Sequence, residues 1–330
     1  MKKRGKESDE DEAPSAEISE EGEDDSESAS SKFGPILARL NAWWEGDEYA
    51  GELPTAEEPE PAAEPTAEAE PDINWSPARC EVVQRLWGDG FSSPGEAEHV
   101  MMLVKPLGLN ETMSVLDLNP GLGGSTRVIA ESTGAWVTGL EADADLVAAG
   151  MEISVKAGMA KKAPVKLYTP PKIELDGSAM DAVISKEALY AMPEKELLFE
   201  EIFKALKPTG QVLFTDYMLP AEDTASAGLD AWLAAERPTP QPWTKDQTVS
   251  RLTDIGFQVR VNEDITDQVK SLVIKSWGGL ISGLKPGQVP RETALAIVLE
   301  AEIWCRRLAL FDANELRCYR IHALKHESGL

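Results

Sequence analysis

Residues 114–143, SVLDLNPGLGGSTRVIAESTGAWVTGLEAD, join two hydrophobic runs through a turn that holds three glycines. The runs Ser114–Leu118 and Trp136–Leu140 have the length and apolar content of buried strands, and Gly124–Ser132 between them has helical spacing. A glycine-rich turn at this place lets a ligand approach the backbone and offers it the free N–H groups of the helix start. The stretch therefore predicts an α/β fold with a ligand site at the turn.

Two acidic residues flank this turn. Asp117 lies near the end of the first predicted strand, and Glu141 follows the second. An acid about twenty residues after such a turn accepts hydrogen bonds from the hydroxyls of a ribose, which favours an adenosine ligand. The order Asp-Leu-Asn-Pro-Gly-Leu-Gly-Gly over residues 117–124 lacks the spacing of a dinucleotide site. Negative charge at its start suits a cationic group and would repel a pyrophosphate.

The turn resembles motif I of the class I methyltransferases, which use S-adenosylmethionine. The stretch MDAVISKEALYAM (180–192) is similar to their fourth strand and its loop, and EEIFKALKPTGQVLFTDYML (200–219) to the helix, turn and fifth strand that follow. Upstream, RLWGDGFSSPGEAEHVMMLVKPLGL (85–109) resembles the segment that caps the site in phosphoethanolamine and related small-amine N-methyltransferases. The resemblance covers residues 82–265. It implies an α/β, Rossmann-like fold with a seven-stranded, mostly parallel sheet in the order 3-2-1-4-5-7-6 and helices on both faces.

The resemblance also implies which residues hold S-adenosylmethionine. The turn would surround the methionine end, Glu141 the ribose and Ala142 the adenine, while residues after the fourth strand line the cofactor and two serines of the capping segment close over the methionine carboxylate. The cofactor-binding residues are then Asp117, Asn119, Gly121, Gly123, Gly124, Glu141, Ala142, Lys186, Ser92 and Ser93. For Gly123 and Gly124, close packing of helix on strand is the alternative explanation.

Residues for the acceptor substrate are expected in the loop after the fourth strand and on nearby rings. Tyr190 is the first candidate for a substrate contact, and Glu187 is the candidate general base. Trp87, Phe91, Tyr217 and Trp243 are the aromatic candidates for the substrate slot. Each ring would equally suit the core, because aromatic side chains bury large areas. The three histidines are too scattered to predict a metal site.

Three departures from the family pattern bear on function. Asn119 replaces the glycine that usually follows the acid, although asparagine tolerates a positive φ. The stretch VKLYTPPKIELDG (165–177) has no acid where the family contacts adenine, so that Tyr168 or backbone groups would replace it. Ala191 stands where the small-amine enzymes place a histidine that handles the amine proton. These departures support a second hypothesis, a methyltransferase-like binding module without catalysis. A NAD-dependent oxidoreductase fits the turn poorly.

The first 73 residues predict a disordered acidic arm. The chain has 58 acidic and 32 basic residues, of which residues 1–72 hold 23 and 6. This composition is too polar to offset the entropy of folding. An amphipathic helix is expected near residues 33–45, where Trp43 and Trp44 lie. It would dock on its own domain or bind a protein partner, and its acidic flanks disfavour a membrane surface.

Residues 74–330 are expected to form the methyltransferase domain. It would include N-terminal capping helices, a lid near residues 220–243 and a C-terminal pair of helices at 265–283 and 290–311. The acidic surplus argues against nucleic acid as a partner. Three widely spaced cysteines favour the cytoplasm, and no apolar run approaches the roughly 18 residues of a membrane span. The expected function is methylation of a small molecule or lipid headgroup, with nitrogen as the acceptor atom.

Overall fold

The computed structural model describes residues 75–175, 177–285 and 289–326. The predicted acidic arm, residues 1–73, and its amphipathic helix near residues 33–45 lie outside the described residues and stay predictions.

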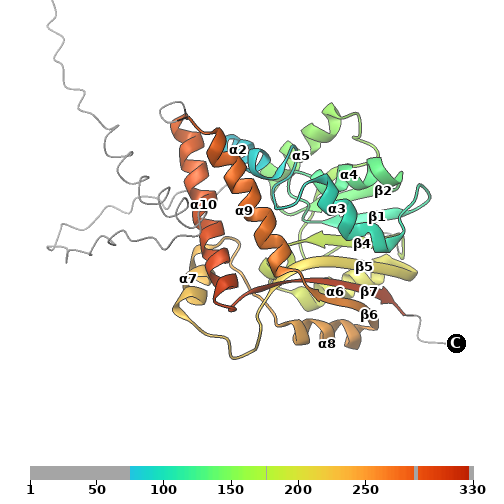
Figure 1. Ribbon diagram of the computed structural model, residues 1–330. Coiled ribbons are helices and arrows are strands. Elements are labelled where there is room, and N and C mark those ends of the chain that lie inside the picture. The colour runs from blue at the N-terminus through green and yellow to red at the C-terminus, as the bar shows by residue number, and fades with distance from the viewer. Residues whose placement is uncertain (1–74, 176, 286–288, 327–330) are drawn as a thin grey trace, which may run out of the picture. The chain divides into compact units, whose positions relative to one another are not determined.

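The described part of the chain holds a seven-stranded sheet in the order β3-β2-β1-β4-β5-β7-β6 (Figure 1). The strands from β3 to β5 run parallel to their neighbours, and β7 is antiparallel to both β5 and β6. The strands are β1 (Ser114–Leu118), β2 (Trp136–Glu141), β3 (Val165–Leu167), β4 (Met180–Lys186), β5 (Leu206–Met218), β6 (Phe257–Asp264) and β7 (Arg317–Lys325). This topology confirms the Rossmann-like methyltransferase fold and the strand order that the resemblance implied.

Helices alternate with the strands, and two long helices precede β7. The helices are α2 (Pro77–Trp87), α3 (Ala97–Val104), α4 (Gly124–Thr133), α5 (Ala144–Lys156), α6 (Lys195–Ala205), α7 (Ala227–Ala235), α8 (Lys245–Ile255), α9 (Thr266–Gly283) and α10 (Arg291–Asp312), with short 3-10 turns η1 (Lys105–Leu107) and η2 (Leu189–Ala191). The predicted C-terminal pair is α9 and α10, which pack on α2 of the capping region (Figure 1). None of the helices in the described ranges is long and apolar enough to cross a membrane.

One predicted boundary is wrong. The sequence suggested that a turn at Lys207–Gly210 separates the helix from the fifth strand, but β5 already begins at Leu206. Leu206 pairs with Met180 of β4, and the register then jumps so that Gln211 pairs with Ala182. The predicted turn is therefore an irregularity inside the strand, with Thr209 at φ +63°.

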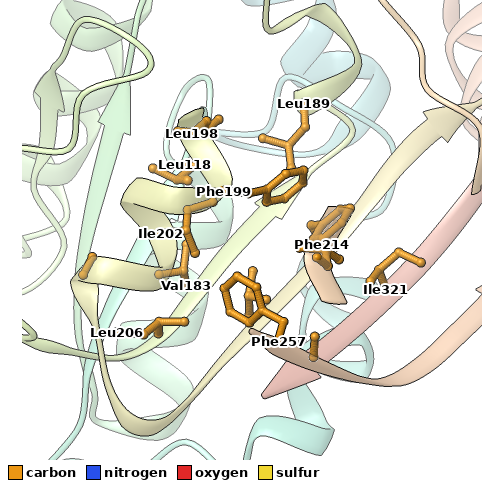
Figure 2. Close-up of a cluster of buried hydrophobic side chains, with 14 of the residues drawn as sticks. Leu118, Val183, Leu189, Leu198, Phe199, Ile202, Leu206, Phe214, Phe257 and Ile321 are labelled. Carbon is orange, nitrogen blue, oxygen red and sulfur yellow. The ribbon is translucent and has the colours of Figure 1, made fainter. Parts of the chain in front are cut away.

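The face of the sheet under α6 and α8 carries a continuous hydrophobic core. Apolar residues of α6 recur at helical spacing, so that Leu198, Phe199 and Ile202 all point to the sheet (Figure 2). The Phe199 ring lies 5.5 Å from that of Phe214 on β5. This packing fixes the position of β4 and β5, whose carboxyl ends carry the predicted site.

We expect Ile202→Ala to lower the free energy of unfolding by about 2–5 kcal/mol, because Ile202 is fully buried and its loss leaves a cavity. Leu197→Ala on the same helix is the matched control, since Leu197 is 46% exposed and should change stability by about 0.5 kcal/mol or less. Denaturant unfolding measures both. Equal effects of the two substitutions would contradict the packing described for α6.

Candidate functional site

The turn between β1 and α4 places three residues in the left-handed region. The φ angles are +55° at Asn119, +59° at Gly121 and +77° at Gly123. The asparagine adopts the conformation predicted for it. At the end of β3, the Tyr168 hydroxyl donates a hydrogen bond of 2.6 Å to Asn119 Oδ1. Burial raises the pKa of Tyr168, which keeps the donor protonated. Asn119 and Tyr168, which lie at two of the places where the sequence departs from the family pattern, thus contact each other.

Asp117 connects the turn to the first residues of α4. Its Oδ2 accepts hydrogen bonds from Ser125 Oγ at 2.6 Å and from Thr126 Oγ1 at 2.7 Å. Burial raises the pKa of Asp117 to about 6, although these two bonds oppose the shift. Both bonds use the same oxygen, so Oδ1 is left for a ligand.

Glu141 holds the turn from the end of β2. Its Oε2 accepts the N–H of Gly121 at 2.8 Å, and its Oε1 accepts the N–H groups of Ala142 and Asp143 at 2.8 and 3.0 Å. Burial raises the pKa of Glu141, and the three N–H groups act against that shift. A carboxylate offers about four acceptor positions, so one position on Oε2 stays available to a ribose hydroxyl.

The capping segment lies directly on the glycine turn. A Cβ atom on Gly121 would lie 1.8 Å from Ser92 Oγ, and one on Gly124 would lie 2.6 Å from the carbonyl oxygen of Gly90. Phe91 also contacts Gly124, at 2.7 Å from the same hypothetical Cβ. The close neighbours of Gly124 belong to the capping segment and not to a strand, so the packing of helix on strand considered for the sequence does not describe this position.

Arg127 on α4 fixes this arrangement. Its guanidinium donates to the carbonyl oxygens of Gly90 and Gly150 and to Ser154 Oγ, each at 3.2 Å. The side chain is buried, and burial lowers the pKa of Arg127 to about 10. The bond to Gly90 ties the capping segment to α4, and the other two tie α4 to α5.

A small cavity lies beside the turn. Its volume is about 20 Å³, roughly what one water molecule needs. It is lined by Val100, Leu103, Val104, Asp117, Ser125, Ile184, Ser185, Lys186 and Leu213. The acceptor groups at the turn fit S-adenosylmethionine: one carboxylate oxygen of Asp117, which lines the cavity, suits its cationic methionine end, and Glu141 at the end of β2 suits its ribose.

Lys186 and Glu187 form an ion pair at the carboxyl end of β4. Lys186 Nζ lies 2.9 Å from Glu187 Oε2 and donates to the Pro94 carbonyl oxygen at 2.6 Å. Glu187 Oε1 accepts the Thr215 hydroxyl at 2.8 Å, and its φ of +47° aims the side chain at β5. The structure therefore places Lys186 in a bridge between β4 and the capping segment.

Tyr190 lies on η2 and is held by two carboxylates. Its N–H donates to Asp216 Oδ1 at 2.8 Å, and its hydroxyl donates to Glu236 Oε2 at 3.1 Å. Burial raises the pKa of Asp216 to about 7, while the charge of Lys195 opposes that shift. Arg307 of α10 donates to the Tyr190 hydroxyl at 2.7 Å. Tyr190 is thus fixed between β5, α7 and α10.

The other predicted aromatic residues occupy different places. Tyr217 lies next to Tyr190, with ring centroids 5.1 Å apart. Trp87 packs edge-on against Trp304 of α10, with ring centroids 5.1 Å apart, and the partly buried Trp243 packs against Phe199 of the hydrophobic core, with ring centroids 6.1 Å apart. Phe91 lies at the glycine turn. Of the predicted aromatic substrate residues, Tyr190 and Tyr217 are the two that contact each other.

The two remaining candidates for the cofactor site lie at the surface of the turn region. Ala142 is exposed, and Ser93 is half-buried beside Ser92. Among the residues that the structure describes, no group of three or more His, Cys, Asp or Glu side chains could hold a metal ion.

Four charged residues of this region were missed by sequence reasoning: Arg127, Asp216, Glu236 and Arg307. The sequence feature that could have identified Arg307 as a buried charge is its position on α10. It lies on the side of the helix where Trp304, Leu308 and Phe311 are buried. A charged residue on an apolar helix face needs a buried partner. The partner, Glu236, is 71 positions away in the sequence, and no local pattern identifies it as the partner of Arg307.

The fold and the turn define a Rossmann-like domain of the class I methyltransferase type. Residues 109–270 match the family model described as "Methyltransferase domain". This match agrees with the class I methyltransferase fold that the sequence resemblance implied.

The relatives specify the resemblance further. The chain is 26% identical over 185 residues to phosphoethanolamine N-methyltransferase 3 of Arabidopsis thaliana, covering 56% of this chain and 37% of that protein. It is 30% identical over 135 residues to phosphoethanolamine N-methyltransferase 2 of Caenorhabditis elegans, covering 40% of this chain and 30% of that protein. The chain thus spans about a third of the length of these relatives.

A solved structure shows the same fold. Phosphoethanolamine N-methyltransferase 2 of Haemonchus contortus, in complex with S-adenosyl-L-methionine, aligns with a TM-score of 0.67 at 19% identity. The alignment covers 75% of this chain and 57% of that one. The domain therefore resembles the phosphoethanolamine N-methyltransferases in fold and in sequence.

We expect the stability of the protein to depend on pH through Asp216. Its pKa is raised to about 7 in the folded state, so the stabilisation from its neutral form is complete below pH 4 and is lost as the pH rises to 7. Asp216→Asn keeps an oxygen atom that accepts the Tyr190 N–H and removes the loss of stability that ionisation causes. The melting temperature of the variant should therefore rise relative to wild type between pH 4 and 7, with about 1.4 kcal/mol for each unit of pKa shift.

Asp223→Asn, at an exposed loop position, is the control and should show a constant difference across the same range. Thermal melts at several pH values measure both variants. A pH-independent difference for Asp216→Asn would show that Asp216 ionises normally.

Proposed function

We propose that this protein transfers a methyl group from S-adenosylmethionine to a small molecule, with nitrogen as the acceptor atom. The observation that carries the proposal is the pair of acids at the ends of β1 and β2. Asp117 and Glu141 flank a left-handed turn, and each keeps acceptor capacity that no hydrogen bond from the described residues uses. The matched methyltransferase family supports the same conclusion.

The residues of the turn would hold the cofactor in the way that the sequence predicted. When bound, S-adenosylmethionine supplies an electrophilic methyl group on a sulfonium centre. Asp117 would face the cationic methionine end, and Glu141 would accept a ribose hydroxyl at Oε2. Ser92, packed on Gly121, would exclude water from this side. Methyl transfer then needs the acceptor in line at about 3 Å and little further chemistry from the protein.

The acceptor would bind at the carboxyl ends of β4 and β5, beside Tyr190. Glu187 is ion-paired with Lys186, so it serves better to orient this region than to remove a proton. The curated relatives named above support nitrogen as the acceptor atom, since both are called N-methyltransferases. Another relative, 27% identical over 182 residues, is called sterol 24-C-methyltransferase, from Yarrowia lipolytica. The acceptor panel should therefore include carbon as well as nitrogen acceptors.

The relatives are named as enzymes, which favours methyl transfer over a binding module without catalysis. A protein partner for residues 33–45 and a lipid headgroup as acceptor stay predictions from the sequence. A cytoplasmic location is part of the proposal, supported by three cysteines that form no disulfide.

We expect micromolar binding of S-adenosylmethionine and S-adenosylhomocysteine in calorimetric titration of the full chain. Asp117→Asn and Glu141→Gln should each weaken binding tenfold or more, about 1.4 kcal/mol, because each removes a charge-assisted hydrogen bond. Glu131→Gln, an exposed position on α4, is the control and should bind like wild type. Circular dichroism confirms that each variant is folded. Absence of binding by wild type would refute the proposed function.

A further inference from the structure

Arg307 of α10 lies among the faces of three aromatic rings. Its guanidinium carbon is 5.5 Å from the ring centroid of Tyr190, 5.0 Å from that of Tyr217 and 4.9 Å from that of Trp304. Cation–π attraction at such distances is the interaction that aromatic cages use to bind ammonium ligands. We call these three rings with Trp232, which stacks on Tyr190 at 5.8 Å, the ring cluster.

Glu236 holds the guanidinium in this position. Arg307 Nε donates to Glu236 Oε1 at 2.7 Å, and Nη2 donates to Glu236 Oε2 at 2.8 Å. The two side chains are only 12% and 4% exposed, so the pair is largely screened from water. A bidentate pair of this kind is strong and geometrically specific. The guanidinium is thus fixed against the rings by a carboxylate.

The ring cluster lies where an acceptor substrate is expected. Tyr190 follows β4, and Tyr217 is next to the last residue of β5. Ligands of open α/β sheets bind at the carboxyl ends of the strands. A ring cage with a buried carboxylate is the usual chemistry for an ammonium group, and here both parts already bind an internal cation.

We propose that Arg307 determines acceptor specificity: it occupies the ring cluster as an internal cation and excludes ammonium groups, so that the acceptor is a neutral or anionic molecule. The inference rests on the proposed function, of which it specifies the substrate class. An ammonium group at the cluster would meet the positive guanidinium at close range and find Glu236 already paired. An uncharged nitrogen is still permitted as the methyl acceptor.

Two unpaired donors in the cluster support this substrate class. Tyr217 Oη and Trp232 Nε1 are buried and have no hydrogen-bond partner among the described residues. An indole N–H can only donate, and an ammonium group has no acceptor to offer it. Oxygen atoms of a neutral or anionic ligand can accept hydrogen bonds from donors of this kind.

The test is to remove the internal cation and supply free cations. Arg307→Ala leaves the ring faces and Glu236 in place, so the full-length variant should bind methylguanidinium and tetramethylammonium at least tenfold more tightly than wild type does. Calorimetric titration with each chloride salt measures this. Methylguanidinium should also restore part of the melting temperature that the variant loses, relative to equal sodium chloride, and should leave wild type unchanged.

Arg306→Ala is the matched control, because the neighbouring Arg306 pairs with Glu302 and is 32% exposed. It should gain no affinity for either salt. If Arg307→Ala does not fold, Arg307→Ala combined with Glu236→Gln removes the whole pair, leaves no unpaired buried charge and keeps the rings. Folded variants that bind neither cation more tightly than wild type would overturn the inference.

The outcome is independent of the proposed function, because neither titration involves S-adenosylmethionine or methyl transfer. Failure of both cations to bind while S-adenosylmethionine still binds wild type would remove the specificity role of Arg307 alone. Failure of wild type to bind S-adenosylmethionine would instead remove the proposed function.

Discussion

The close approach of the capping segment to the glycine turn is the constraint on which the site depends. Gly121 and Gly124 have no room for a Cβ atom, since Ser92 and the Gly90 carbonyl oxygen fill that space. Arg127 maintains the contact by its hydrogen bond to Gly90. The turn, its acids and the residues that cover it therefore form one packed unit, in which a change at one position moves the others.

Buried charge in this unit is compensated in two ways. Asp117 and Glu141 are held mainly by hydroxyl and backbone N–H donors, which stabilise a carboxylate without fully neutralising it. Lys186 with Glu187, and Arg307 with Glu236, are instead complete ion pairs. The first kind leaves negative charge available to a cationic ligand, whereas the second leaves none. The glycine turn is thus prepared for a cation, and the ring cluster is not.

The sequence predicted the sheet and the place of the glycine turn well, because both depend on local patterns. Strand runs, the turn and the acids at strand ends all lie within short stretches of chain, and Asn119 took the positive φ that its chemistry allows. The start of β5 was misplaced, because the pairing of Leu206 with Met180 of β4 extends the strand before the predicted turn at Lys207–Gly210. The acceptor side could not be predicted for the same reason. Arg307 and Glu236 come together only when α7 and α10 pack.

The exclusion of ammonium ions that we propose for Arg307 would also account for Ala191. Ala191, where the small-amine enzymes have a histidine, lies on η2 beside Tyr190 and is 7% exposed. A histidine there serves to remove a proton from an amine that arrives as an ammonium ion. If Arg307 excludes ammonium ions from the ring cluster, no such proton has to be removed, and the small residue is sufficient. The loss of the histidine is then a consequence of a different acceptor and does not require the loss of catalysis, since methyl transfer to a neutral nucleophile depends on position more than on a base.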